Sequence, residues 1–168
     1  MNARASRLNR RNMIRTTGAA FAGAVGATVI HAVPAVAAGF SFTPITPYRS
    51  VDIRSIDKLP EGIFEDWDVW TDQNGSSRIP SNAAAVTFNL TATGTEGVPG
   101  FLGISPAGVP IPDVSTLNWV NAGADVANGG TVKLGTSSQT GPGSVSVFCG
   151  GVPAAKTWYI IDITGYYS

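Results

Sequence analysis

The sequence contains a single histidine and a single cysteine among its 168 residues. The histidine, His31, lies in a segment that we predict to be removed, so the remaining chain has no imidazole for a Ser-His-Asp triad or for histidine-ligated zinc, copper or iron. The cysteine, Cys149, has no partner for an intramolecular disulfide. We expect it to be a buried thiol, with an intermolecular disulfide as the alternative. We predict no catalytic residue, no metal and no cofactor.

Acidic residues are absent from the first 51 positions, because the first carboxylate is Asp52. Five arginines precede an apolar run over 18–30 that is rich in glycine and alanine, and the sequence Ala35-Val36-Ala37 follows. A basic start, an apolar middle and a small-x-small end are typical of a secretory signal. The stretch from Arg10 to Arg15 matches the twin-arginine pattern. We therefore predict a twin-arginine signal peptide, forming a helix, over residues 1–37, with the twin-arginine translocase of a bacterial or archaeal cell as partner.

Long hydrophobic runs are also absent. The apolar stretch at 18–30 is shorter than the roughly 20 residues that a membrane-spanning helix needs. We expect cleavage after Ala37 and an extracellular or surface-associated product. Retention of residues 1–37 as a membrane anchor is the alternative.

Basic residues are scarce beyond residue 37, where six lysines and arginines accompany all eleven acidic residues. The remaining 131 residues therefore carry a net charge of about −5. A negative surface repels phosphate backbones, so we predict no nucleic-acid partner.

No segment shows a helical apolar period, whereas glycine and proline recur between short runs of valine, isoleucine, threonine and aromatic residues. This pattern predicts an all-β fold. We expect residues 38–168 to form a single-domain, antiparallel, jelly-roll-like β-sandwich of about eight or nine strands. The expected strands cover 39–43, 48–53, 83–93, 100–105, 115–120, 124–127, 131–135, 143–149 and 156–164.

Two segments carry further structural predictions. Val86, Phe88 and Leu90 alternate with polar residues, which indicates a strand with one buried face. The run 157–164 is apolar on both faces, so we expect a central strand. Residues 55–81 are acidic and bear two tryptophans without clear periodicity, which favours a long loop or an excursion from the sheet.

Several blocks resemble a small domain that is common in exported actinobacterial proteins. They are Thr46-Pro-Tyr-Arg49 with Asp52-Ile-Arg54, Asn89-Leu-Thr-Ala-Thr93, Ser115-Thr-Leu-Asn118, Val126-Ala-Asn128 and Asp162-Ile-Thr-Gly-Tyr166. The order matches over most of residues 40–167. Ile53 stands where the family usually has threonine, and the acidic segment 57–72 replaces a glycine-rich connection. The resemblance implies an exported β-domain, often joined to cell-wall or surface enzymes, and brings no catalytic residues.

The segment 57–72 supplies the candidate binding residues. Trp67 and Trp70 alternate with the carboxylates of Asp66 and Asp68, and aromatic rings beside carboxylates are one way to hold a sugar. These four residues are therefore the candidate ligand-binding residues. The pattern favours a simpler interpretation, in which the tryptophans pack the segment onto the sandwich and the carboxylates form a solvated acidic loop, and calcium binding by these carboxylates is a further alternative.

Asp162 falls within the expected central strand, where a carboxylate needs a partner. We predict that it lies inside the sandwich and pairs with Arg49 or Arg54. The catalytic alternative is acid–base hydrolysis by Asp52 and Glu65.

Three hypotheses for function follow. The first is an exported, non-catalytic binding or structural domain at the cell surface, with carbohydrate or cell-wall polymer as the ligand. The second is a secreted, carboxylate-dependent glycan hydrolase. The third is a subunit of a surface fibre or homo-oligomer.

Overall fold

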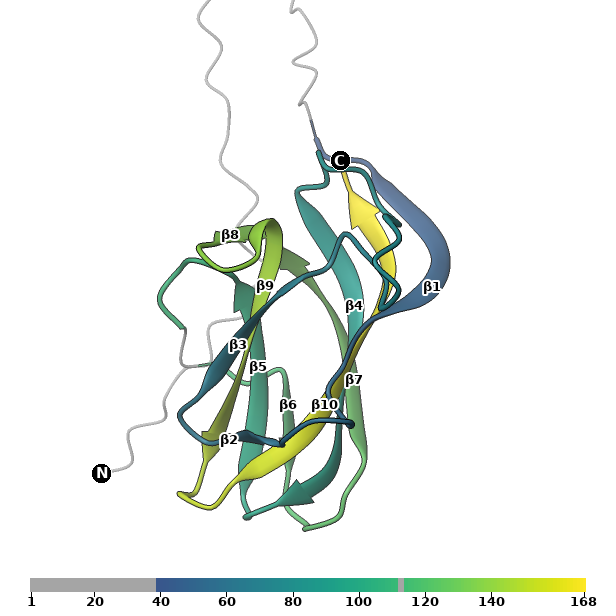
Figure 1. The fold of residues 1–168 in the computed structure, drawn as a ribbon. Helices are drawn as coiled ribbons and strands as arrows, with labels where there is room; N and C mark the ends of the chain where they lie inside the picture. Colours follow the sequence, from purple (N-terminus) through teal and green to yellow (C-terminus); the bar gives the residue numbers. More distant parts are fainter. Residues whose placement is uncertain (1–38, 112–113) are drawn as a thin grey trace, which may run out of the picture. The chain divides into compact units, whose positions relative to one another are not determined.

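A computed structural model describes residues 39–111 and 114–168, and Figure 1 shows its course. The predicted signal peptide over 1–37 lies outside the described residues. Among the described residues no helix is long and apolar enough to cross a membrane. The described strands are β1 (Phe42–Asp52), β2 (Leu59–Pro60), β3 (Phe64–Asp68), β4 (Ala85–Glu96), β5 (Gly100–Pro106), β6 (Leu117–Trp119), β7 (Val126–Lys133), β8 (Gly135–Ser137), β9 (Gly141–Gly151) and β10 (Lys156–Tyr167).

The strands form two antiparallel sheets. Sheet A has the order β1-β10-β4-β7, with β2 also paired to β10. Sheet B has the order β3-β9-β5-β6, with β8 also paired to β9. The two sheets share one hydrophobic cluster, so the arrangement is β-sandwich-like and the all-β prediction is confirmed. The described strands number ten because two pairs of expected strands are joined, which leaves seven, and β2, β3 and β8 are additional.

Alternation along the strands builds the core. Val86, Phe88 and Leu90 of β4 are buried as predicted. β10 lies between β1 and β4, so the prediction that it is central is confirmed. From sheet B, Val145 and Val147 are fully buried in the same cluster.

Two expected strand breaks are wrong. The segments 39–43 and 48–53 belong to one strand, β1, whose pairing with β10 shifts register between Pro44 and Tyr48. An edge strand tolerates proline because the missing N–H can face away from its neighbour. The segments 124–127 and 131–135 are likewise joined, because β7 runs without a register shift through the residues that separate them.

The expected excursion at 55–81 is wrong in two places. β2 pairs with β10, and β3 pairs with β9 along its whole length as an edge strand of sheet B. The other described residues of this segment form turns, bends, an isolated bridge and loops around those strands. The acidic, tryptophan-bearing segment therefore includes part of the sandwich itself.

Candidate functional site

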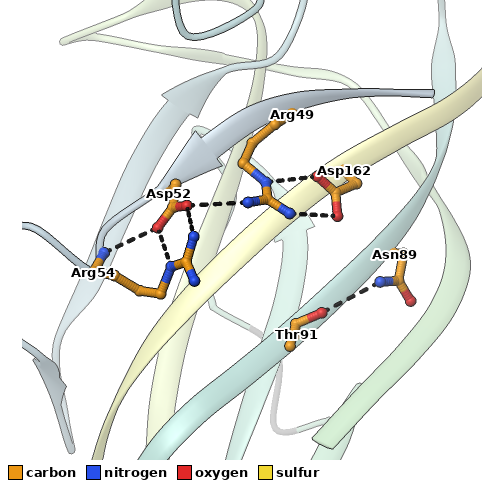
Figure 2. A network of polar contacts seen from close by, with 6 residues as sticks. All are labelled: Arg49, Asp52, Arg54, Asn89, Thr91 and Asp162. Carbon is orange, nitrogen blue, oxygen red and sulfur yellow. Dashed lines mark hydrogen bonds and ion pairs between the residues drawn. The ribbon is translucent and has the colours of Figure 1, made fainter. Parts of the chain in front are cut away.

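An ionic network lies where β1 meets β10 (Figure 2). Arg49 and Asp162 are direct cross-strand partners, and the Arg49 Nε atom donates to Asp162 Oδ1 at 2.9 Å. The Arg49 Nη1 atom also donates to Asp52 Oδ2 at 3.2 Å. Arg54 completes the network, because its Nη2 atom donates to Asp52 Oδ2 at 2.6 Å and its Nε atom donates to Asp52 Oδ1.

The predicted pairing of Asp162 with an arginine is confirmed, but its predicted position inside the sandwich is wrong. The Asp162 side chain is 26% exposed and that of Arg49 is 39% exposed. Neighbouring residues of a strand face opposite sides of the sheet, and Ile161 and Ile163 point into the core. Asp162 therefore lies on the outer face of sheet A, where its carboxylate keeps contact with solvent.

The network fixes the charge of Asp52. Hydrogen bonds from the Arg54 side chain, aided by the Arg54 backbone N–H and the charge of Arg49, lower the pKa of Asp52 to about 2. This carboxylate is consequently ionised at every physiological pH. It can accept hydrogen bonds or attract a cation, but it cannot donate a proton.

A solvent-open cleft of about 490 Å³ adjoins this network. One side comes from the end of β1 and the turn after it, and the other comes from β3 and the loop after it. The lining residues are Ser50, Val51, Asp52, Ile53, Ile56, Trp67, Asp68, Thr71, Asp72, Gln73, Gly75 and Thr140. A smaller depression lined by Asp52, Arg54, Ser55 and Gln73 adjoins it, so polar groups continue along the surface.

Trp67 lines the cleft and also packs against the core. Its indole Nε1 atom donates to the hydroxyl of Tyr159, a fully buried residue of β10 in the opposite sheet. The Tyr159 hydroxyl in turn donates to Glu65 Oε2 at 2.6 Å. Burial, together with this carboxylate, raises the pKa of Tyr159 far above its ordinary value. The chain Trp67–Tyr159–Glu65 therefore joins the two sheets beside the cleft.

Asp68 also lines the cleft, and its carboxylate holds the loop that follows β3. Asp68 Oδ1 accepts from the Trp70 backbone N–H at 2.8 Å, and Oδ2 accepts from the Thr71 hydroxyl. Ser50 of β1 donates to the carbonyl of Thr71 at 3.1 Å. These bonds tie both sides of the cleft together, so its shape is set by the fold.

The other two predicted binding residues lie elsewhere. The Trp70 ring covers Gly143 of β9, where an added Cβ would come within 2.2 Å of it. Its Nε1 atom is buried and has no partner among the described residues. Asp66 accepts a hydrogen bond from the Ser146 hydroxyl. The cleft therefore gathers Trp67 and Asp68, and leaves Trp70 and Asp66 in separate packing and hydrogen-bonding roles.

The acidic residues of 57–72 do not gather into a cation site. Within residues 39–111 and 114–168, no group of three or more acidic, histidine or cysteine side chains is arranged to hold a metal ion. Asp72 instead caps a turn, because its Oδ1 atom accepts from the backbone N–H groups of Asn74 and Ser76. Such turns are a common role for aspartate in loops.

Asp52 and Glu65, the alternative hydrolytic pair, belong to different networks. Asp52 is held by two arginines on sheet A, whereas Glu65 accepts from Tyr159 at the inner side of sheet B.

Cys149 is buried as predicted, and burial with the charge of Glu61 raises the pKa of its thiol to about 12. The thiol is therefore protonated and unreactive.

Sequence reasoning missed several residues of the cleft, above all Ser50, Thr71 and Gln73. The signal available was the Asp72-Gln-Asn-Gly75 stretch, which reads as a turn. A turn motif does not reveal that its second residue, Gln73, lines a cleft together with residues of β1, which ends 21 positions earlier. Comparison of the chain with protein-family models, curated proteins and solved structures finds no match.

Proposed function

We propose that residues 38–168 form an exported, non-catalytic binding domain at the cell surface, and that the cleft beside β1 and β3 binds a neutral carbohydrate of the cell wall. The observation that carries this proposal is the composition of the cleft. One solvent-open space of about 490 Å³ combines an indole with carboxylates and the amide of Gln73. This volume lies within the range of small-molecule sites, which is about 300–1,000 Å³.

The chemistry of the cleft suits a hydroxyl-rich ligand. Carboxylates accept hydrogen bonds from sugar hydroxyls, and the amide of Gln73 both donates and accepts. The ring of Trp67 offers an apolar surface to the C–H groups of a sugar. Asp52 is paired with Arg49 and Arg54, and Asp72 with Arg78, so charges of both signs are balanced around the cleft and a neutral ligand suits it.

The predicted signal peptide supports a cell-surface location for this binding. The arginines, the apolar run and the small-x-small sequence at 35–37 favour a twin-arginine signal peptide, and the translocase is then the partner during export. The actinobacterial resemblance agrees with that location.

We also propose that the fold belongs to the jelly-roll class. Without β2 and β8, the remaining eight strands have the orders 1-8-3-6 and 2-7-4-5, which suits two interlocked Greek keys.

A sedimentation assay tests the proposed ligand class. The purified protein is mixed with insoluble peptidoglycan and with common neutral polysaccharides, and the fraction that sediments is measured. Retention on at least one glycan is expected. Failure of every glycan to retain the protein would contradict the carbohydrate proposal.

A matched pair of variants tests the site. The chain has two glutamines, Gln73 in the cleft and Gln139 in an exposed loop. We expect Gln73→Trp, which places a large ring in the cleft, to reduce retention at least tenfold. Gln139→Trp should leave retention unchanged. Equal retention by both variants would place any glycan site outside the cleft.

A further inference from the structure

The strand β7 ends sheet A and leaves one edge open. Its pairing partner in the described sheets is β4, and the register between them runs without a shift over all eight residues of β7. Five consecutive residues, Ala127 to Thr131, are exposed. Figure 1 shows β7 along the margin of its sheet. An edge strand of this kind presents unpaired N–H and C=O groups to another strand.

The other three terminal strands carry features that discourage pairing. β1 has two register shifts and the charged side chains of Arg49 and Asp52. β3 carries three carboxylates within five residues, and β6 is only three residues long. Short strands, bulges and charges are the usual protections of a sheet edge. Between Val126 and Val132, β7 has none of them.

The charges at the two ends of β7 are opposite. Asp125 directly precedes the strand and Lys133 is its last residue. Both are exposed, and their odd numbers place them on the same face, opposite to buried Val132. The Thr93 hydroxyl and the Gly94 backbone N–H both donate to Asp125 Oδ1, which leaves Oδ2 able to pair with a cationic side chain. Lys133 forms no ion pair with the described residues.

We propose that two copies of this chain join through β7, antiparallel and related by a two-fold axis at Gly129. In this register Asp125 of one copy lies directly opposite Lys133 of the other, and the symmetry repeats the pair at both ends. The glycines at 129 and 130 place no side chain at the centre, so the backbones can approach closely. Sheet A then continues across the two-fold axis as one sheet, which is strand addition by a second copy.

Cross-linking tests the register. In this arrangement residue 129 faces its own counterpart, with Cβ atoms about 5 Å apart, close to the span of a disulfide. A Cβ at Gly129 would contact only the Phe88 carbonyl oxygen, at 3.3 Å, and Cys149 is buried. We expect Gly129→Cys to form a covalent dimer under mild oxidation. Thr131→Cys is the control, because its counterpart lies roughly 13 Å further along the strand. Absence of a Gly129→Cys dimer, or an equal yield from both variants, would overturn the register.

Analytical ultracentrifugation of the unmodified protein tests the interface independently. We expect a concentration-dependent monomer–dimer equilibrium. Thr131→Lys, which adds a charge to the open edge, should raise the dissociation constant at least tenfold. Thr46→Lys changes an exposed threonine of β1 and should not. A protein that stays monomeric at every concentration, or a dimer equally tolerant of both variants, would overturn the proposal.

Discussion

Arg49 and Asp162 lie directly opposite each other on β1 and β10, and their ion pair stands on the outer face of sheet A. Its 2.9 Å contact joins the edge strand to the central strand of that sheet. Because both side chains keep contact with solvent, the pair is screened and its desolvation cost is small. The pair therefore aligns the end of β1 beside the cleft more than it stabilises the domain.

The first prediction concerns the stability that this pair contributes. Asp162→Ala should lower the free energy of unfolding by about 1 kcal/mol, the upper end for a partly exposed ion pair. Urea denaturation measures this value. Asp57→Ala, at an exposed carboxylate, is the control and should change it by less than about 0.5 kcal/mol. A loss of about 3–5 kcal/mol for Asp162→Ala would mean that the pair behaves as a buried one.

The second prediction concerns pH. The hydrogen bonds from Arg54 lower the pKa of Asp52 to about 2 from a usual value near 4. A lowered pKa in the folded state contributes stability above the unfolded pKa, and that contribution is lost as the pH falls towards 2. Asp52→Asn should therefore be less stable than the parent at pH 6, and the difference should shrink between pH 4 and pH 2. A difference that stays constant across this range would show that the charge of Asp52 is not responsible.

The third prediction concerns the buried hydroxyl of Tyr159. Tyr159→Phe removes the group that accepts from Trp67 and donates to Glu65. The partly buried groups of Trp67 and Glu65 that lose their partner should cost about 1–3 kcal/mol of unfolding free energy. Tyr166→Phe, at a partly exposed position of the same strand, is the control. Equal stability of the two variants would contradict a structural role for this network.

The fourth prediction tests the packing of Trp70 on β9. Gly141 and Gly143 both have left-handed backbones, with φ of 82° and 81°, but only at Gly143 would a Cβ collide with the Trp70 ring. Gly141→Ala should cost about 1–2 kcal/mol for the backbone alone. Gly143→Ala should cost a further ~1–3 kcal/mol because of overpacking. If calorimetry gives the two variants the same melting temperature, the ring does not rest on this glycine.

The sequence predicts strands whose apolar and polar residues alternate locally. It does not predict strands whose buried polar groups form hydrogen bonds with residues far away in the sequence. β4 is predictable because Val86, Phe88 and Leu90 alternate with polar residues within one strand. β3 is not predictable in this way, because a charged residue faces the interior and an apolar residue faces solvent. Glu65 and Trp67 face inward and Phe64 faces solvent, being 51% exposed. Glu65 is tolerated there because Tyr159, 94 positions later, donates a hydrogen bond to it.

The glycines of β7 illustrate the same limit. Asn128-Gly-Gly130 reads as a turn, yet it continues the strand. Gly130 lies against the Phe88 ring of β4, where an added Cβ would come within 3.0 Å of it. A glycine that makes room for an aromatic ring on the next strand looks, in sequence, like a glycine that bends the chain. For the candidate site, Trp67 and Asp68 were predictable from composition, whereas Gln73 and Ser50 depend on how the two sheets meet.

The most direct test of the proposed binding cleft is a nuclear magnetic resonance titration of the ¹⁵N-labelled protein with soluble, neutral cell-wall oligosaccharides. We expect saturable shifts of backbone amides in three groups of cleft residues, at 50–53, at 67–68 and at 71–73 with Gly75, together with the indole N–H of Trp67. The amides of β7 and the indole N–H of Trp119, which is bonded to the Gly97 carbonyl, should stay in place. No shift at millimolar oligosaccharide, or shifts confined to residues away from the cleft, would contradict carbohydrate binding in the cleft.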